Sequence, residues 1–291
     1  MRMDLGDFPK SLTLRGETCT GGWRGELRTP TECVALSDIQ SIYYRRPSGF
    51  SFPEDLSDAD RVFAGEEARH GLGGLLAAMD VLWVNDPIRA SVADYKPLQL
   101  KIASRSGLLT PATLVTNDLG AVIDFAAAQS GPIVCKALSP IVHSENGEVR
   151  ITFTTPVDPA GIDPAELAVT AHLFQAWVPK EYEVRVTMVG RTPFAVTIHA
   201  SSESGHIDWR SDYGALTYSP GSVPDDVRAG MVRYLDTLGL AYGAFDFVVK
   251  PTGEWVFLEC NPAGQWLWLE EATGLPMAAA LADLLVGGQQ V

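Results

Sequence analysis

Three oxygen-bearing side chains stand close together near the C-terminal end of the chain. Asp246 falls within one apolar run, and Glu259 and Asn261 end the next, with the turn-forming Pro251-Thr252-Gly253 between the runs. Two apolar runs around such a turn predict a β-hairpin, and pairing about the turn brings Asp246 near Glu259. Two carboxylates and an amide oxygen on one sheet face suit Mg²⁺ that also holds phosphate oxygens. These residues alone are equally compatible with an ordinary strand pair that carries carboxylates at its edge and binds no metal.

A lysine interrupts an apolar run in the first half of the chain. Lys136 lies within the sequence PIVCKAL, at residues 132–138, which is otherwise typical of a buried strand. An unpaired charge in such a strand costs several kcal/mol, so a lysine there is expected to have an anionic partner.

The composition narrows the classes of function. The chain has 291 residues and a formal net charge of −14, which argues against a general nucleic-acid or acidic-membrane surface. An anionic substrate must therefore meet a local cluster of Arg and Lys. The four cysteines show no C-x-x-C spacing, and no apolar run approaches the roughly 20 residues that span a bilayer. We therefore expect a cytoplasmic protein with reduced thiols, bound to neither nucleic acid nor membrane.

The hydrophobic patterns predict alternating helices and strands. Helices are expected over residues 64–79, 91–106, 117–129, 224–238 and 275–286, and strands over 82–84, 132–138, 181–190 and 194–200, before the hairpin. Asn117 and Asp118 are expected to cap one helix, Asp163 to cap a further short one, and Gly239 to end the helix over 224–238. Residues 139–155, with His143, Asn146 and Gly147, resemble a loose hairpin that could cover a ligand. The fold class is α+β or α/β.

The order of these features resembles the ATP-grasp ligases over about residues 91–268. The resemblance implies that Lys96 and Lys136 hold the nucleotide phosphates and that Glu183 accepts hydrogen bonds from ribose. It further implies an adenine-binding linker at Gln175, Ala176, Trp177 and Val178. The same resemblance places Arg185 and Arg210 at the reacting phosphates as catalytic residues and makes Asp246, Glu259 and Asn261 ligands of Mg²⁺. ATP and Mg²⁺ are the cofactors that it implies.

A narrower resemblance covers nearly the whole chain. The stretches YYRRP, YKPLQLKIA, FQAWVPKEYEVRVTMVG, IDWRSDY and FLECNPAGQWLWLE are similar to the actinobacterial ATP-grasp ribosomal peptide maturases, the graspetide or microviridin-type macrocyclases. This resemblance implies a ribosomal precursor peptide with a leader and an acidic core as the partner. The implied reaction joins Asp or Glu side chains to Ser or Thr hydroxyls, or to Lys amines, through an acyl phosphate. It also suggests a homodimer, and peptide contacts at Arg45 and Arg46. Trp209 stands next to the anion-binding Arg210 and could line the peptide channel.

The resemblance divides the chain into three parts. Residues 1–90 would form a pre-ATP-grasp lobe, 91–170 the central ATP-grasp subdomain and 171–291 the C-terminal subdomain with the metal site. Chains of this kind usually open with a β-α unit before the segment matching residues 1–15. A missed upstream start codon is the simplest account of the difference, and a first lobe that is genuinely shortened is the other.

Two other functions remain open. An ATP-grasp ligase could instead add an amino acid to a small molecule or to a protein terminus. A peptide-binding protein that has lost catalysis is disfavoured, because Lys96, Lys136, Asp246, Glu259 and Asn261 are all present.

Overall fold

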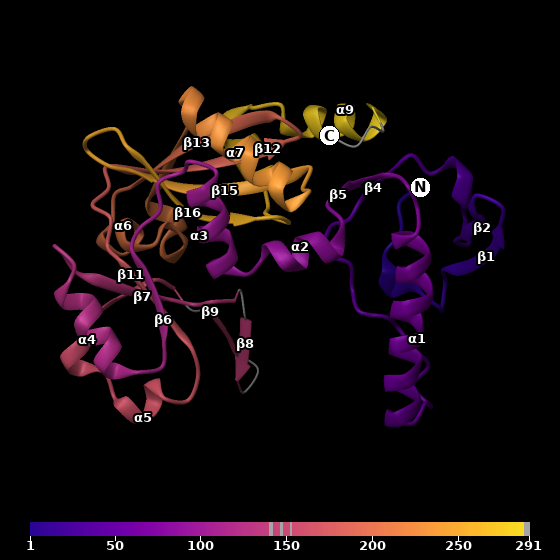
Figure 1. Cartoon of the computed structure of the whole chain (residues 1–291). Helices are drawn as coiled ribbons and strands as arrows, with labels where there is room; N and C mark the ends of the chain where they lie inside the picture. Colours follow the sequence, from indigo (N-terminus) through magenta and orange to yellow (C-terminus); the bar gives the residue numbers. More distant parts are fainter. Residues whose placement is uncertain (140–141, 146–147, 152, 288–291) are drawn as a thin grey trace. The chain divides into compact units, whose positions relative to one another are not determined.

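The computed structural model describes residues 1–139, 142–145, 148–151 and 153–287. The chain divides into two compact units, residues 1–87 with 279–291 and residues 88–278 (Figure 1). The three-part division expected from the sequence stays a prediction. Within the described residues, no helix is both long enough and apolar enough to cross a membrane.

The first unit combines two small sheets with one long helix. Its antiparallel sheet has the order β1-β2-β3 (Thr13–Cys19, Gly22–Arg28, Cys33–Ala35), and β4 pairs in parallel with β5 (Ser41–Tyr43, Leu82–Val84). Helix α1 spans Asp58–Ala77 and packs Leu72, Leu75 and Leu76 into the core of this unit. It begins six residues before the expected residue 64, because the Ser57 hydroxyl accepts from the Asp60 amide and caps the helix. Two 3₁₀ turns lie at Leu5–Asp7 and Leu36–Asp38.

A five-stranded antiparallel sheet forms the larger part of the second unit. Its order is β14-β13-β12-β15-β16, with bounds Leu216–Gly221, Thr192–Ala200, Tyr182–Val189, Tyr242–Val249 and Trp255–Asn261. Helices α3 (Lys96–Arg105) and α7 (Asp225–Leu238) lie beside this sheet (Figure 1), and residues of both helices share one hydrophobic core with it. As expected, Gly239 ends α7: its φ of 63° is a left-handed conformation that glycine adopts without a Cβ clash.

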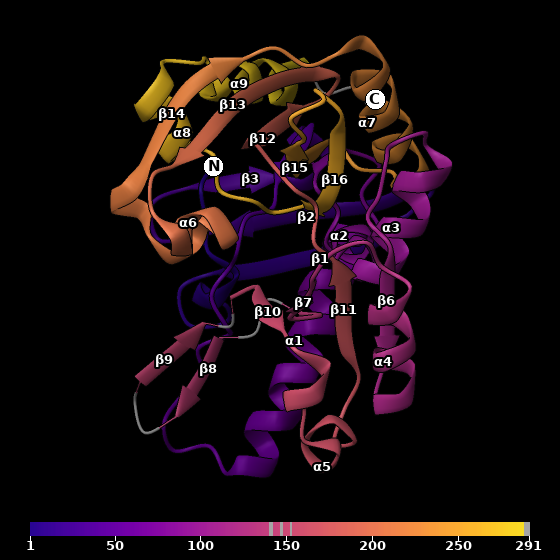
Figure 2. The same cartoon turned by 90° about the vertical axis from the view of Figure 1, so that its left-hand side faces the viewer.

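A second, four-stranded antiparallel sheet carries Lys136. Its order is β10-β7-β11-β6, with bounds Thr155–Val157, Ile133–Lys136, His172–Ala176 and Thr113–Thr116. Helix α4 (Leu119–Ala127) lies beside β6 (Figure 2), and Asp118 caps it by accepting from the Gly120 amide, as predicted. The short α5 (Pro164–Leu167) follows its predicted cap Asp163. A 3₁₀ turn at Pro159–Gly161 precedes α5.

The hairpin expected over residues 139–155 forms from two short strands. Strands β8 (Val142–Glu145) and β9 (Glu148–Ile151) pair antiparallel with each other. Its turn, including Asn146 and Gly147, lies outside the described residues, and a covering role for this hairpin stays a prediction.

The single helix predicted over residues 91–106 is wrong, because two helices occupy this stretch. Helix α2 covers Pro87–Ala93 and α3 begins at Lys96, with Pro97 in its first turn. In a continuous helix the Pro97 ring would clash with the carbonyl of Ala93, four residues earlier, whereas the first turn tolerates proline. The break places Lys96 at the start of α3.

The remaining helical segments are short or terminal. They are α6 (Glu203–Ile207), α8 (Leu267–Thr273), α9 (Met277–Gly287) and 3₁₀ turns at Trp209–Ser211 and Tyr213–Ala215.

Candidate active site

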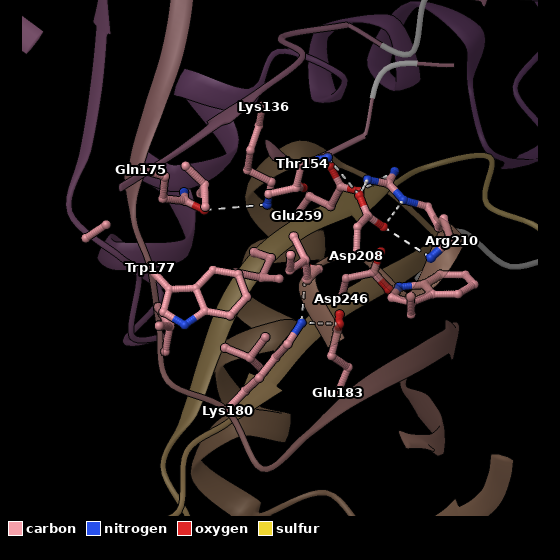
Figure 3. Close-up of a pocket in the computed structure, with 17 residues that line it drawn as sticks. Lys136, Thr154, Gln175, Trp177, Lys180, Glu183, Asp208, Arg210, Asp246 and Glu259 are labelled. Atoms are coloured by element: carbon pink, nitrogen blue, oxygen red, sulfur yellow. Dashed lines mark hydrogen bonds and ion pairs between the residues drawn. The ribbon is translucent and has the colours of Figure 1, made fainter. Parts of the chain in front are cut away.

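A pocket of about 550 Å³ lies in the second unit (Figure 3). Residues from both sheets line it, together with the linker 177–181 between β11 and β12 and the segment 207–210 at the end of α6 and the start of the following 3₁₀ turn.

Strand alternation places carboxylates on the pocket side of the five-stranded sheet. In β15, Phe245 and Phe247 enter the hydrophobic core, whereas Asp246 lines the pocket. Asp246 pairs directly with Glu259 of β16, so the predicted hairpin and its pairing are confirmed. The turn closes with a hydrogen bond from the Gly253 amide to the Lys250 carbonyl, 2.8 Å long.

A bulge in β16 adds one residue to the pocket wall. Phe247 pairs with Phe257, and Asp246 pairs with Glu259, which leaves Leu258 as an extra residue in β16. Strict alternation would place Phe257 on the same face as Glu259. With the bulge, Phe257 lies in the core while Leu258 and Glu259 both line the pocket.

Cations hold the two predicted metal-binding carboxylates. The Lys96 ammonium contacts Glu259 Oε2 at 2.7 Å. Arg185 donates to both oxygens of Asp246, at 2.7 and 2.6 Å, and its guanidinium lies 5.0 Å from the centre of the Trp209 ring. Because both members of each pair are largely buried, bulk water solvates and screens their charges only weakly.

Arg210 is oriented by a neighbouring carboxylate. Its Nε and Nη2 donate to the two oxygens of Asp208 at 2.9 and 2.7 Å, and its Nη1 lies 3.8 Å from Glu259 Oε1 (Figure 3). Asp208 also accepts from the Thr154 amide at 3.0 Å. Burial alone would raise the pKa of Asp208, but the hydrogen bonds from Arg210 hold it well below its usual range. Asp208 therefore stays ionised and fixes the direction of Arg210.

Lys180 and Glu183 form a second buried pair at the linker end of the pocket. Lys180 Nζ contacts Glu183 Oε1 at 2.5 Å, donates to the Ile207 carbonyl and lies over the Trp177 ring (Figure 3). Burial raises the pKa of Glu183, and the charge of Lys180 opposes that rise. The pair closes one side of the pocket next to the predicted adenine linker.

Lys136 is the pocket cation with the weakest compensation. Its ammonium contacts the neutral Gln175 Oε1 at 3.5 Å, and among the described residues it has no carboxylate within 4 Å. Burial lowers the pKa of Lys136, and the nearby charge of Glu259 works in the opposite direction. A desolvated ammonium without a close anion is a strong site for a ligand's negative charge.

The charges around Glu259 stabilise its ionised form. Burial would raise the pKa of this carboxyl, but Lys96, Lys136 and Arg210 together lower it to about 2. The pKa values of Arg185 and Arg210 are raised by their carboxylate partners although burial lowers them. Glu259, Arg185 and Arg210 are therefore all charged at neutral pH.

Most of the residues predicted for the site are brought together. Those lining the pocket are Lys136, Gln175, Ala176, Trp177, Val178, Glu183, Trp209, Arg210, Asp246 and Glu259. Lys96 and Arg185 adjoin it through their ion pairs with Glu259 and Asp246. Arg45 and Arg46 are exposed residues of the first unit.

The sequence reasoning missed Lys180 and Asp208. Both line the pocket, and each directs a predicted residue by an ion pair. Short spacing was the available signal: Lys180 stands three residues before Glu183, and Asp208 stands two before Arg210.

The chain's donors fit a nucleotide with a divalent cation. Asp246 and Glu259 face each other across two strands, and Asn261 Oδ1 accepts from the Ala263 amide at 2.9 Å, so the carbonyl oxygen of Asn261 keeps a lone pair for a metal. Within the described residues, no group of three or more His, Cys, Asp and Glu gathers as a metal site. The fit therefore depends on two carboxylates, an amide and the phosphates that the cations would hold.

Comparison with known proteins identifies the kind of enzyme. Residues 1–91 match the family described as the MvdD pre-ATP grasp domain. A RiPP-associated ATP-grasp ligase of Chryseobacterium gregarium, solved with ADP and a leader and core peptide, is 29% identical, with a TM-score of 0.90 over 100% of this chain and 91% of that one. The chain is an ATP-grasp ligase.

Two further structures agree with the ligase over almost its whole length. The macrocyclase MdnC of Microcystis aeruginosa, bound to the precursor peptide MdnA, is 27% identical, with a TM-score of 0.83 over 99% of the ligase and 90% of MdnC. The macrocyclase MdnB of the same organism is 28% identical, with a TM-score of 0.78 over 98% and 90%. A search of curated proteins gives no match to the ligase. The fold and family recognised from the sequence are confirmed.

Proposed function

We propose that the ligase macrocyclises a ribosomal precursor peptide. It joins Asp or Glu side chains to Ser or Thr hydroxyls, or to Lys amines, and each ring costs one ATP through an acyl-phosphate intermediate. Full-length similarity to RiPP-associated ligases and macrocyclases supports this substrate class.

The single observation that carries the proposal is the alternation of cations and carboxylates around the pocket. The cations are Lys96, Lys136, Lys180, Arg185 and Arg210, and the carboxylates are Glu183, Asp208, Asp246 and Glu259. A carboxylate and a terminal phosphate repel each other, so joining them requires positive charge where negative charge accumulates. A set of ion pairs is suited to a ligand that brings phosphates and a divalent cation together. The phosphates can bind the cationic member of a pair, and the divalent cation can bind the carboxylate.

The chain's residues divide this work by position. Lys136 and Lys96 neutralise phosphate oxygens, and Glu183 accepts hydrogen bonds from the ribose hydroxyls beside the linker Gln175–Val178. Arg185 and Arg210 stabilise the charge that develops at the transferring phosphate and at the acyl phosphate. Asp246, Glu259 and Asn261 hold the metal. ATP with Mg²⁺ supplies the phosphoryl group and the divalent charge that turn the carboxylate into an electrophile.

The second step needs positioning more than a reactive protein group. The substrate hydroxyl or amine attacks the acyl carbon, and phosphate leaves. Largely buried walls such as Trp209, Val248 and Leu258 limit water at the site, which protects the acyl phosphate from hydrolysis. Holding the two reacting groups together supplies much of the remaining rate.

The partner and its contacts belong to the same proposal. The exposed Arg45 and Arg46 would supply local positive charge for an acidic core peptide on a chain whose net charge is −14. Trp209 would be a separate peptide contact at the pocket. A leader segment, a homodimer and a cytoplasmic location complete the proposal.

The test is the intact mass of a precursor peptide. A candidate precursor peptide with a leader and an acidic core is incubated with the protein, ATP and Mg²⁺, in parallel with Glu259→Gln. We expect the peptide to lose one water mass for each ring, only with ATP, and not with the variant, because Glu259 carries the charge that the metal and Lys96 require.

A matched control distinguishes the site from a general effect of charge. Glu254→Gln removes an exposed carboxylate of the turn between β15 and β16 and leaves the mass loss unchanged. The contrary result is that wild-type protein leaves the peptide mass unchanged and releases ADP when free amino acids are supplied. That result would overturn the proposal of peptide macrocyclisation and favour a small-molecule ligase.

A further inference from the structure

Gln99 is a buried polar side chain next to the site. It is 4% exposed and lies on α3, three residues after Lys96. Its amide nitrogen donates to the Ala93 carbonyl at 2.7 Å and to the Cys260 carbonyl at 2.9 Å, and its oxygen accepts from the Cys260 amide at 3.0 Å. Two carbonyl partners on one side and an amide on the other allow only this orientation of the glutamine amide.

These bonds continue the edge of the five-stranded sheet. Strand β16 is the last strand in its sheet, and Phe257 donates its amide to the Leu109 carbonyl at 2.8 Å. Beyond the bulge at Leu258, Gln99 takes over and satisfies both backbone groups of Cys260. One side chain thus replaces a neighbouring strand where an edge would otherwise stay unpaired.

The residue held by Gln99 stands between two of the proposed metal ligands. Cys260 is flanked by Glu259 and Asn261, and the ammonium of Lys96 contacts Glu259. Lys96 and Gln99 are one helical turn apart, so helix α3 reaches the same short segment of β16 twice, once by charge and once by hydrogen bonds.

The bond to Ala93 fixes the start of α3 as well. The carbonyl of Ala93 lies four residues before Pro97, which has no amide hydrogen to donate. The Gln99 side chain supplies that missing donor and ties the end of α2 to the first turns of α3.

We propose that Gln99 is a positioning residue that sets Glu259 and Asn261 relative to Lys96, and thereby sets the affinity for the divalent cation bound with nucleotide. The inference rests on the proposed function, because it takes these residues as metal and phosphate ligands. Residues that orient metal ligands typically change metal affinity by about 10–100-fold when they are replaced.

The test measures Mg²⁺-dependent binding of ADP in place of peptide ligation. Isothermal calorimetry with ADP across a Mg²⁺ titration gives the half-saturating Mg²⁺ concentration for wild type, Gln99→Met and Gln129→Met. Gln129 is the matched control, because its amide donates to the Phe125 carbonyl at the end of α4, on the four-stranded sheet. We expect an increase of about 10–100-fold for Gln99→Met and no change for Gln129→Met.

Thermal unfolding of the same variants separates positioning from general stability. Should Gln99→Met fail to fold, Gln99→Ala replaces it, since the space left admits water to the same backbone groups. A variant that folds and shows the wild-type Mg²⁺ dependence would overturn the positioning role. A loss of ADP affinity in Gln99→Met that is equal with and without Mg²⁺ would also overturn the positioning role. Wild-type protein that binds ADP without any Mg²⁺ dependence would overturn the proposed function and the inference together.

Discussion

The two faces of the five-stranded sheet are built from the same strands and differ in every respect that matters to function. On one face Val186, Phe245 and Phe257 are fully buried against α3 and α7. On the other, Asp246 and Glu259 meet Arg185 and Lys96 around the pocket. Burying apolar area drives folding, whereas buried ion pairs contribute little net stability because desolvation offsets their attraction. The apolar face therefore stabilises the sheet, and the residues of the pocket face are available for binding and catalysis.

The largest expected effect comes from breaking the apolar face. Phe257→Ala removes a ring that packs on Tyr234, Phe245 and Phe247, at centroid distances of 5.7, 6.2 and 5.9 Å. We expect the free energy of unfolding to fall by about 3–5 kcal/mol, measured by chemical denaturation. The folded fraction should keep its affinity for ADP with Mg²⁺. Weak binding without any loss of stability would contradict the division between the faces.

Replacing Lys136 on the charged side of the pocket should have the opposite effect, a large loss of activity with little loss of stability. Lys136→Met removes the least compensated cation, so the rate of peptide cyclisation should fall by about 10²–10³-fold, as when one preorganised donor to a developing charge is lost. The free energy of unfolding should stay within about 1 kcal/mol, because no close ion pair is broken. Lys250→Met, which alters only the exposed turn pair with Glu254, is the control and should leave the rate unchanged. A large loss of stability in Lys136→Met would mean that this lysine is structural.

A smaller effect concerns the acid stability of the ligand-free protein. The pKa of Glu259 is lowered to about 2, from about 4.3 for an ordinary glutamate. A lowered pKa means that its contribution to stability is complete above about pH 5 and is lost as the pH falls through 4.3 towards 2. That contribution is on the order of 3 kcal/mol. Glu259→Gln should therefore flatten this part of the curve of unfolding free energy against pH, measured by chemical denaturation at each pH.

An exposed ion pair provides the reference for that curve. Asp236→Asn breaks the pair with Arg191, in which both side chains are 49% exposed. Its free energy of unfolding should change by no more than about 1 kcal/mol at any pH, because solvent screens such pairs. If the two variants gave the same acid profile, the pocket charges would not be coupled as the structure indicates.

Local patterns were sufficient for much of the fold and part of the site. The alternation around Pro251-Thr252-Gly253 predicted the hairpin and the pairing of Asp246 with Glu259, and Asp118 and Gly239 marked helix ends correctly. These features depend on residues adjacent in sequence, where the backbone rules act directly.

The features that could not be predicted depend on distant segments. Each cation's partner is set by tertiary packing: Arg185 meets Asp246 from 61 residues away, and Lys96 meets Glu259 from 163 residues away. Gln99 gave no signal, because a glutamine on a helix is ordinarily solvated. The helix break at Pro97 was foreseeable from the proline alone, whereas the bulge at Leu258 could be seen only once both strands were paired.

The bulge gives β16 a place where the chain can change length. Removing Leu258 would restore regular alternation, with Phe257 still opposite Phe247 and Glu259 still opposite Asp246. The pocket would lose one apolar wall while the aromatic core and the acidic end of the strand kept their partners. Related enzymes could thus reshape the ligand space through gain or loss of a single residue, a change that substitution alone does not provide.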